Sequence, residues 1–121
     1  MYLRPRQCFT KYLVFERQSR LDLRGREVVE FKPTSAQILG AVSTLKSYEM
    51  ERFKHTSLKV DFVIVQRGSP KAKIGDLLIC AEKKFLIQHV ENILEQWTLY
   101  YVERRFDMWK VGLIYEVARI H

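Results

Sequence analysis

Residues 21–37, with the sequence LDLRGREVVEFKPTSAQ, decide how the rest of the chain is divided into elements. Residues 24–26 are typical of a turn, because the glycine adopts backbone angles that other residues avoid. Residues 27–32 set apolar side chains between charged ones and predict a strand. Thr34 followed by Gln37 resembles the capping box that opens a helix, so the stretch predicts strand, turn, strand and helix in that order.

Hydrophobic periodicity extends this prediction along the chain. Apolar side chains at every second position indicate a strand, and those at every third or fourth position indicate a helix. The predicted strands are residues 8–17, 21–23, 27–32, 59–66 and 108–120, and the predicted helices are residues 33–55 and 83–104. Residues 74–80 fit either type. We therefore predict a single α+β domain over residues 1–121, with a mixed β-sheet of about five strands and two main helices.

The composition favours one packed intracellular domain. Apolar residues make up 47% of the chain, which predicts a hydrophobic core rather than disorder. Cys8 and Cys80 form no Cys-x-x-Cys pair, so neither a disulfide scaffold nor a zinc site is indicated. We see no secretory signal and no apolar run that would span a membrane, and expect a cytoplasmic, nucleoid or nuclear protein with no membrane partner. A short basic domain of this kind is also compatible with a viral source.

Asp22, Glu30 and Lys32 have the chemistry of a divalent-metal phosphodiesterase. Side chains alternate along a strand, so Glu30 and Lys32 are expected on the same face. The carboxylate oxygens of Asp22 and Glu30 suit a hard cation such as Mg²⁺, which makes these two residues the candidate metal ligands. The ammonium of Lys32 would orient the attacking water or stabilise developing charge, so Glu30 and Lys32 are the candidate catalytic residues.

The order of these elements resembles the core of the PD-(D/E)XK nuclease superfamily over residues 9–66. On that resemblance, Asp22 takes the aspartate position, and Glu30 and Lys32 take the acidic and lysine positions of the Glu-x-Lys element. Gln37 is placed like a glutamine found in some branches of the superfamily. The resemblance implies Mg²⁺-dependent cleavage of a phosphodiester bond.

The alternative is an ordinary charged hairpin. The chain departs from the superfamily pattern in having Leu21, rather than proline, before the aspartate. The charges in question are Asp22, Arg24, Arg26, Glu27 and Glu30. Exposed alternating charges of this kind form cross-strand ion pairs, each worth at most about 1 kcal/mol.

The excess of positive charge predicts a polyanionic partner, of which nucleic acid is the commonest. The formal net charge is +7. The candidate nucleic-acid contacts are Arg17, Arg20, Arg24, Arg26, Arg67, Lys71 and Lys73. The alternative is that these side chains only keep a small domain soluble.

The sequence thus predicts a basic nucleic-acid-binding protein, and its sharpest version is the divalent-metal-dependent nuclease. One alternative is a non-catalytic module, either for DNA or RNA binding or for homodimeric assembly. Another is an adaptor for an acidic protein. The broad apolar stripe over residues 85–101 would let a homodimer bury part of it. Whether the protein is an enzyme, and whether it prefers DNA or RNA, stays open at this point.

Overall fold

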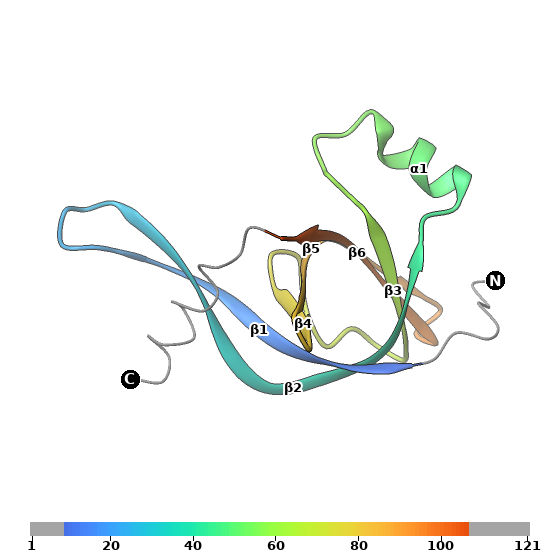
Figure 1. Cartoon of the computed structure of the whole chain (residues 1–121), viewed down its shortest axis with the longest axis horizontal. Helices are drawn as coiled ribbons and strands as arrows, with labels where there is room; N and C mark the ends of the chain where they lie inside the picture. The colour runs from blue at the N-terminus through green and yellow to red at the C-terminus, as the bar shows by residue number, and fades with distance from the viewer. Residues whose placement is uncertain (1–8, 107–121) are drawn as a thin grey trace.

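The computed structural model describes residues 9–106, which form a closed barrel of six antiparallel strands with one short helix outside it (Figure 1). In chain order the elements are β1 (Thr10–Leu21), β2 (Glu27–Thr44), α1 (Ser47–Lys54), β3 (Phe62–Arg67), β4 (Leu77–Cys80), β5 (Lys83–Ile93) and β6 (Trp97–Arg105). Around the barrel the strands follow the order β1, β2, β3, β6, β5 and β4, and β4 pairs with β1 to close it. Closure pairs both edges of the sheet, which removes the exposed edges that promote aggregation.

Side chains that alternate along the strands fill the inside of the barrel. Every second residue of a strand points to the same face, which here is the interior. The interior cluster consists of Tyr12, Val14, Ile38, Ile64, Leu78, Phe85, Ile87, Tyr100 and Val102. Each of these side chains is at most 3% exposed, so the barrel is packed and has no open channel.

Two further apolar clusters lie on the outside of the barrel. Helix α1 covers the outer face of β3 and β6, and the residues of that cluster are Phe53, Val63, Val65, Leu99 and Tyr101. The residues of the second cluster are Phe15, Phe31, Leu77 and Ile79, from β1, β2 and β4. Because Leu78 points into the barrel, alternation places its neighbours Leu77 and Ile79 on the outer face.

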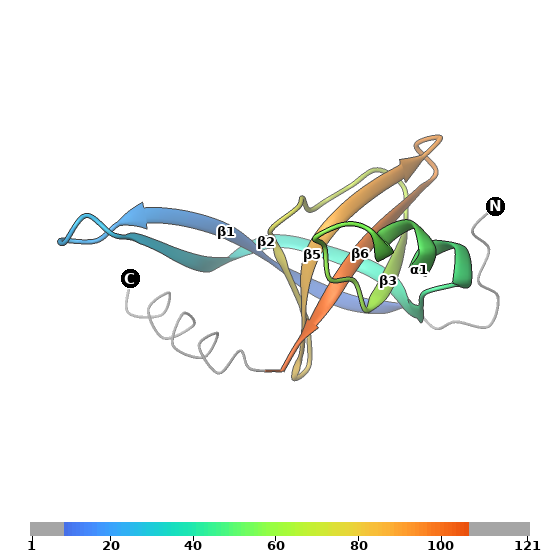
Figure 2. The same ribbon diagram turned by 90° about the horizontal axis from the view of Figure 1, so that it is seen from above.

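Strands β1 and β2 continue beyond the barrel as a two-stranded ribbon of residues 17–31, which we call the projecting hairpin (Figures 1 and 2). Among the described residues, 17–21 pair only with 27–31, whereas Leu13 to Phe15 pair with β4 as well. Figure 2 shows that the hairpin reaches away from the barrel, with α1 on the far side. The same two strands are therefore part of the barrel wall at one end and form a free arm at the other.

The predicted helix over residues 33–55 is wrong over most of its length, because β2 continues through this segment. Ile38 points into the barrel, as the two-residue period of a strand requires. Gly40 allows the next strand to approach, since a Cβ atom there would lie 2.6 Å from Cγ2 of Ile64. Only α1, at the end of the predicted helix, is helical.

The predicted helix over residues 83–104 is also wrong, because this segment is the hairpin of β5 and β6. Its turn contains Leu94 and Glu95, with positive φ angles of 51° and 59°. Gly, Asn or Asp usually occupy such positions, so the sequence carried no common turn signal here. The side chain of Asn92 closes the turn instead, because its Oδ1 accepts the N–H of Glu95 at 2.9 Å.

The predicted α+β class, with a mixed sheet of about five strands and two main helices, is thus corrected to a mostly β fold. The predicted turn at residues 24–26 is confirmed as the tip of the projecting hairpin, and the predicted strand at 59–66 is confirmed from Phe62 onward as β3. Residues 74–80, which fitted either type, contain β4. The predicted strand at 108–120 lies outside the described residues. Within the described part of the chain, no helix has the length and apolarity to cross a membrane.

Candidate functional site

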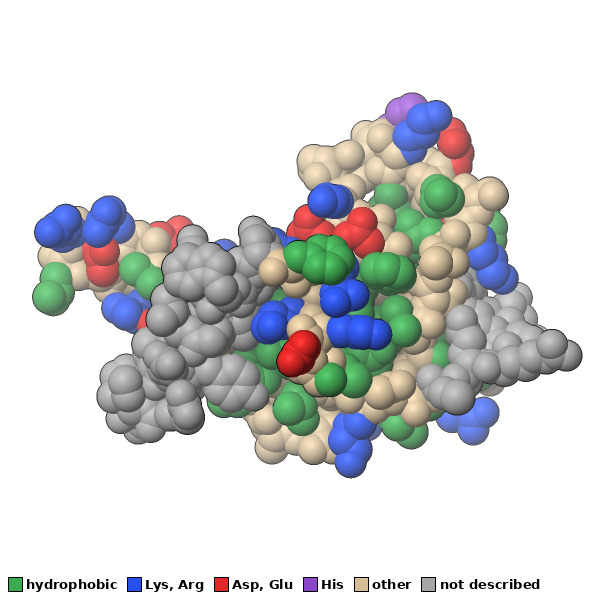
Figure 3. Space-filling model, viewed as in Figure 1, with side chains coloured by type: hydrophobic (Ala, Val, Ile, Leu, Met, Phe, Trp, Pro, Cys, Tyr) green, Lys and Arg blue, Asp and Glu red, His purple; other side chains and the backbone are tan. Residues whose placement is uncertain are grey.

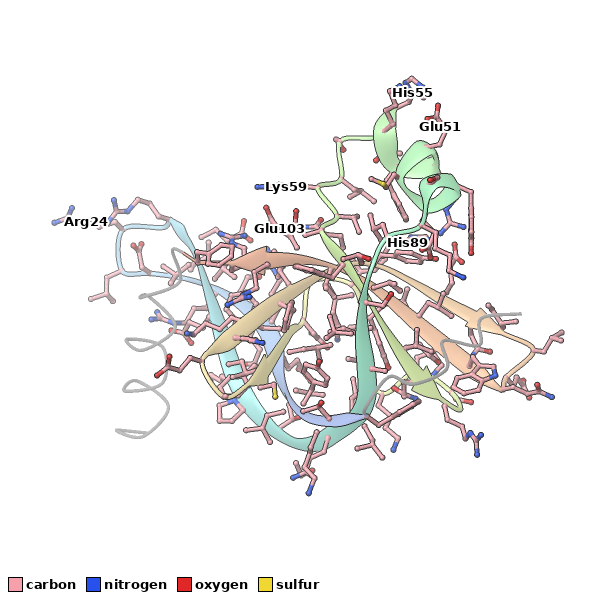
Figure 4. The ribbon with its side chains drawn as sticks, turned by 45° about the vertical axis from the view of Figure 1, so that its right-hand side comes forward. Arg24, Glu51, His55, Lys59, His89 and Glu103 are labelled. Atoms are coloured by element: carbon pink, nitrogen blue, oxygen red, sulfur yellow. The ribbon has the colours of Figure 1, made fainter. Side chains whose placement is uncertain are left out.

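The tip of the projecting hairpin is a turn closed by Asp22. Its Oδ1 accepts the N–H groups of Arg24 and Arg26, both at 2.8 Å, and its Oδ2 accepts Nε–H of Arg26 at 3.3 Å. Gly25 supplies the positive φ angle of 76°. The hydrogen bond from the backbone of Arg26, followed by those from Arg24 and the Arg26 side chain, lowers the pKa of Asp22 below its usual range. Figure 4 shows Arg24 at this end of the hairpin, far from the barrel.

Glu30 and Lys32 lie on β2, nearer to the barrel than the turn. The Glu30 carboxylate pairs across the hairpin with Nε of Arg20 at 2.8 Å, while Lys32 is exposed. Alternation keeps Glu30 and Lys32 on the same face of β2. The pairing register places Glu30 about 10 Å along the strand from the turn that holds Asp22. The three residues are therefore spread from the turn to the base of the arm and do not converge on one of its ends.

The metal site predicted for Asp22 and Glu30 stays a prediction. Both carboxylates accept hydrogen bonds from arginine side chains of the hairpin. Among residues 9–106, no group of three or more His, Cys, Asp and Glu side chains is arranged to hold a metal ion. The order of elements that suggested the nuclease core also differs from the observed one, because Gln37 lies on β2 and not in the first turn of a helix.

One face of the projecting hairpin carries a line of apolar side chains beside Arg17, Ser19 and Glu27. Ser19 pairs with Val29, and Leu21 lies two positions from Ser19, so Val29 and Leu21 share a face. Phe31, two positions from Val29, shares it as well. Exposure rises along this face from 8% at Phe31 to 37% at Val29 and 71% at Leu21, and Leu23 in the turn is fully exposed. We call these four residues the apolar stripe; it begins in a buried cluster and ends in solvent.

The opposite face and the turn carry most of the charges of the hairpin, while Arg17 and Glu27 lie on the face of the apolar stripe. Arg20 pairs with Glu30, and Arg26 pairs with Asp22, so most of these charges are matched within the hairpin. Figure 3 shows Lys and Arg side chains at the tip interspersed with Asp and Glu and with apolar side chains. The tip is consequently a mixed surface and not a uniformly basic one.

The base of the projecting hairpin is tied to the barrel by Asp76, which is 3% exposed. Its Oδ1 accepts the N–H of Arg17 at 3.2 Å, and its Oδ2 accepts the N–H of Lys73 at 3.1 Å. Arg17 begins the hairpin, and Lys73 belongs to the loop between β3 and β4. One buried carboxylate therefore joins the arm to that loop.

The structure brings Arg67, Lys71 and Lys73 together on the loop of residues 67–73, which we call the basic loop. All three side chains are exposed, and within residues 9–106 none forms an ion pair with a carboxylate. The arginines of the hairpin turn are separated from this loop by roughly 15 Å of ribbon. The arginines of the turn and the cations of the basic loop thus form two separate groups, while Arg17 lies at the base of the arm and is joined to the basic loop through Asp76.

Two buried polar side chains hold the basic loop, and the sequence analysis missed both. Gln66 donates from Nε2 to the carbonyl of Ser69 at 2.6 Å, and Tyr100 donates its hydroxyl to Oε1 of Gln66. The Tyr100 oxygen also accepts the N–H of Lys71 at 2.9 Å. Burial raises the pKa of Tyr100, so the phenol stays protonated in neutral solution. The available signal was the position of Gln66, a polar residue that follows directly on the apolar run of β3.

A groove opens beside the basic loop, and we call it the Trp97 groove. Its lining residues are Phe9, Leu39, Gln66, Arg67, Lys71 and Trp97, and its volume is about 520 Å³. The guanidinium carbon of Arg67 lies 5.3 Å from the centre of the Trp97 ring. The groove therefore combines apolar and aromatic walls with two positive charges.

Helix α1 is fixed to the barrel by a buried carboxylate. Glu49 is fully buried; its Oε1 accepts the N–H of Lys46 at 2.9 Å, and its Oε2 accepts the hydroxyl of Tyr101 at 3.0 Å. Figure 4 shows Glu51 and His55 on the outer side of this helical segment, away from the barrel. Glu49 could not be recognised from the sequence, because its partner Tyr101 on β6 is distant in the chain.

No protein-family model matches this chain, and no curated protein matches it in sequence. In structure, the chain is similar to protein SF1141 from Shigella flexneri 2a, whose solution structure matches with a TM-score of 0.64. The match covers 87% of this chain and 99% of that chain, at 8% sequence identity. Identity this low shows a shared fold and carries no functional assignment.

Proposed function

We propose that the protein is a non-catalytic assembly module that docks through its projecting hairpin onto a second copy of the same chain. The observation that carries the proposal is the apolar stripe of Phe31, Val29, Leu21 and Leu23. The barrel is closed without residues 17–31, so the arm contributes nothing to closure. A role in contact with another molecule accounts for an arm of this kind.

The low stability expected of an unsupported arm favours this proposal. A two-stranded ribbon is marginally stable in water unless a third strand or a packed face supports it. Phe31 packs into a buried cluster at the base, but Val29 and Leu21 face solvent further along. Burying one leucine side chain completely contributes about 1.5–3 kcal/mol. Leu21 and Leu23 together therefore supply a useful part of the free energy of a dimer.

A second copy is a suitable partner because the chain also exposes apolar side chains on its barrel. On the barrel part of β1 and β2 these are Leu13, Leu39 and Val42. Two ion pairs of the arm can survive docking, since Arg20 is already paired with Glu30 and Arg26 with Asp22. Arg24 and Glu27 form no ion pair within the described residues, so the contact must leave them at its rim, where water still solvates them and no unpaired charge is buried.

Sedimentation velocity over a series of concentrations tests the proposal. We expect the full wild-type chain to associate as its concentration rises. The double variant Leu21→Ser, Leu23→Ser removes the apolar end of the stripe, and we expect it to stay monomeric over the same range. Both side chains are exposed, so this variant should keep the stability of the barrel within about 0.5 kcal/mol.

Leu94→Ser is the matched control, because Leu94 is 82% exposed at the tip of the other hairpin. It should associate like the wild type. A wild-type chain that stays monomeric at every concentration would overturn self-association. Equal association of the wild type and the Leu21, Leu23 variant would show that another surface is responsible.

We propose nucleic-acid binding as a second candidate function, and the basic loop is the observation that favours it. Arg67, Lys71 and Lys73 are exposed on a backbone that Gln66 and Tyr100 hold in place. Exposed cations on a fixed loop suit phosphate contacts, whose affinity falls steeply with salt.

Binding of a labelled oligonucleotide over a salt series tests this second function. Lys73→Ala should lower the affinity and make its salt dependence shallower by about one ion. Lys83→Ala, an exposed lysine on β5, is the control and should change neither quantity by as much. If no oligonucleotide binds even at low salt, this second function is wrong, and the assembly function is unaffected.

A further inference from the structure

The Trp97 groove has a rigid frame on both sides. The basic loop forms one side, and the hydrogen bonds of Gln66 and Tyr100 fix its backbone. On the other side, the turn of β5 and β6 is tied to the same loop, because Asn92 Nδ2 and Thr98 Oγ1 donate to the carbonyl of Gly68 at 3.3 and 2.7 Å. A frame that is already ordered loses little conformational entropy on binding.

The pairing of β3 with β6 brings the aromatic wall and the charges together. Arg67 is the register partner of Trp97, and its guanidinium carbon lies 5.3 Å from the ring centre. Phe9, which is 43% exposed, lines the same groove with Lys71. The Arg67 guanidinium lies over the face of the Trp97 ring, and the ammonium of Lys71 lines the same groove. This combination matches a ligand that has both a π-face, which can replace the guanidinium over the ring, and a negative charge, which the guanidinium can then contact.

Glu95 makes the two sides of the groove electrostatically different. It lines a shallow depression of about 330 Å³ that shares Arg67 and Trp97 with the groove. The carboxylate of Glu95 disfavours a phosphate on that side, whereas Lys71, which lines the groove, favours one on the other side. Lys73 lies further along the loop, in a separate depression that Glu16 and Asp76 also line. A bound polyanion would therefore run along the basic loop, with its π-face turned towards Trp97.

From this geometry we propose that the Trp97 groove binds an unpaired nucleotide of a single-stranded nucleic acid. A base stacks on Trp97 in place of the Arg67 guanidinium, which turns to the adjoining phosphate together with Lys71. Duplex bases keep their faces in the stack, so a duplex reaches only the lysines and arginines. This inference rests on nucleic-acid binding as the second candidate function. It adds a preference for single strands over duplexes and names Trp97 as the residue responsible for that preference.

Fluorescence anisotropy with a labelled single-stranded oligonucleotide and with its duplex tests the proposal. We expect the full wild-type chain to bind the single strand more tightly than the duplex. Trp97→Leu should lower the single-strand affinity about tenfold, because base stacking on an aromatic ring is lost. Trp97→Tyr keeps a stacking face and should retain most of the affinity. Neither change should alter the weak duplex affinity.

Arg67→Ala keeps the proposal testable if Trp97→Leu does not fold. It should lower the single-strand affinity, while Lys83→Ala on β5 serves as the charge-matched control. If duplex and single strand bind equally and Trp97→Leu changes nothing, the groove proposal is overturned, and nucleic-acid binding through the loop alone stands. If neither binds at low salt, both fail together.

A labelled acidic peptide with one phenylalanine tests the other chemistry that the groove could accept. We expect it to bind more weakly than the single strand and to be displaced by it. Binding of the peptide in the groove without binding of the oligonucleotide would overturn the proposal in favour of a protein partner. The variants used here lie outside the apolar stripe, so the assembly function is tested separately.

Discussion

In each of the two long hairpins of this protein, a side-chain oxygen closes the turn by accepting backbone N–H groups. The two turns differ in whether that side chain also contacts the rest of the barrel. Asp22 closes the turn between β1 and β2, and Asn92 closes the turn between β5 and β6. Among the described residues, the hydrogen bonds of the Asp22 side chain stay within its own hairpin turn. Asn92 also donates to the carbonyl of Gly68 on the basic loop. One turn is therefore self-contained, while the other is part of the barrel's end.

This difference shows that one hairpin contributes to the stability of the barrel, while the other extends away from it. The β5–β6 hairpin shares its strands with β4 and β3 and buries side chains in the barrel. The projecting hairpin pairs with nothing else among the described residues and exposes Leu21. Damage to the first should unfold the molecule, and damage to the second should change only what it contacts.

The largest expected effect distinguishes the cores of the two hairpins. Ile87 on β5 is 1% exposed inside the barrel, so Ile87→Ala should cost about 2–5 kcal/mol of unfolding free energy. Val29→Ala on the projecting hairpin removes a side chain that is 37% exposed, and should cost about 1 kcal/mol or less. Urea denaturation of both variants measures the two costs, and similar values would contradict the division into barrel and arm.

The next effect distinguishes the two turns. Asn92→Ala removes one acceptor for Glu95 and the donor to Gly68, and should cost about 1–3 kcal/mol. Asp22→Ala should change global stability by less than about 0.5 kcal/mol, because the turn it closes lies away from the barrel. Asn92→Asp keeps the acceptor and loses the donor, so its stability should lie between that of Asn92→Ala and that of the wild type. Equal losses for the Asn92 and Asp22 alanine variants would refute the comparison.

Alkaline pH should act on the barrel. Burial, together with the charge of Cys80, raises the pKa of Tyr12 to about 12, and burial raises the pKa of Tyr100 as well. The folded state then holds these protons more tightly than the unfolded state, whose tyrosines titrate near pH 10. The stabilising contribution is complete below about pH 10 and is lost as the pH rises through the folded values. The denaturation midpoint of the wild type should therefore fall between neutral and alkaline pH. The midpoint of Tyr12→Phe, compared with its own value at neutral pH, should fall less.

Acidic pH should have the smallest effect, confined to the tip of the projecting hairpin. The pKa of Asp22 is lowered, so its contribution is present above the ordinary aspartate pKa and is lost as the pH falls through the lower folded value. The backbone amide shifts of Arg24 and Arg26 should titrate together in NMR spectra. Asp22→Asn should abolish that titration. A titration that coincides with global unfolding would show that the tip is not independent.

The sequence predicted local features well and missed those that depend on distant partners. The turn at residues 24–26 was recognisable because Gly25 itself provides the required backbone freedom. The strand character around Gly40 was not, because it depends on the contact with Ile64 on another strand. The β5–β6 turn was missed because Leu94 and Glu95 occupy positions that seldom hold such residues.

The candidate sites divide in the same way. Arg67, Lys71 and Lys73 could be grouped from the sequence because they are neighbours in the chain. Trp97 could not be added to them, because only the pairing of β3 with β6 places it opposite Arg67. A sequence pattern therefore located the charges and left the aromatic wall undetected.

Because barrel closure is complete at Phe15, the arm can change length while the barrel stays the same. Adding two residues to each strand would lengthen it by about 7 Å and return every side chain to its original face. Adding one would turn Val29 and Leu21 to the opposite face. The length of the arm can therefore change in steps of two residues per strand without moving the apolar stripe to the other face.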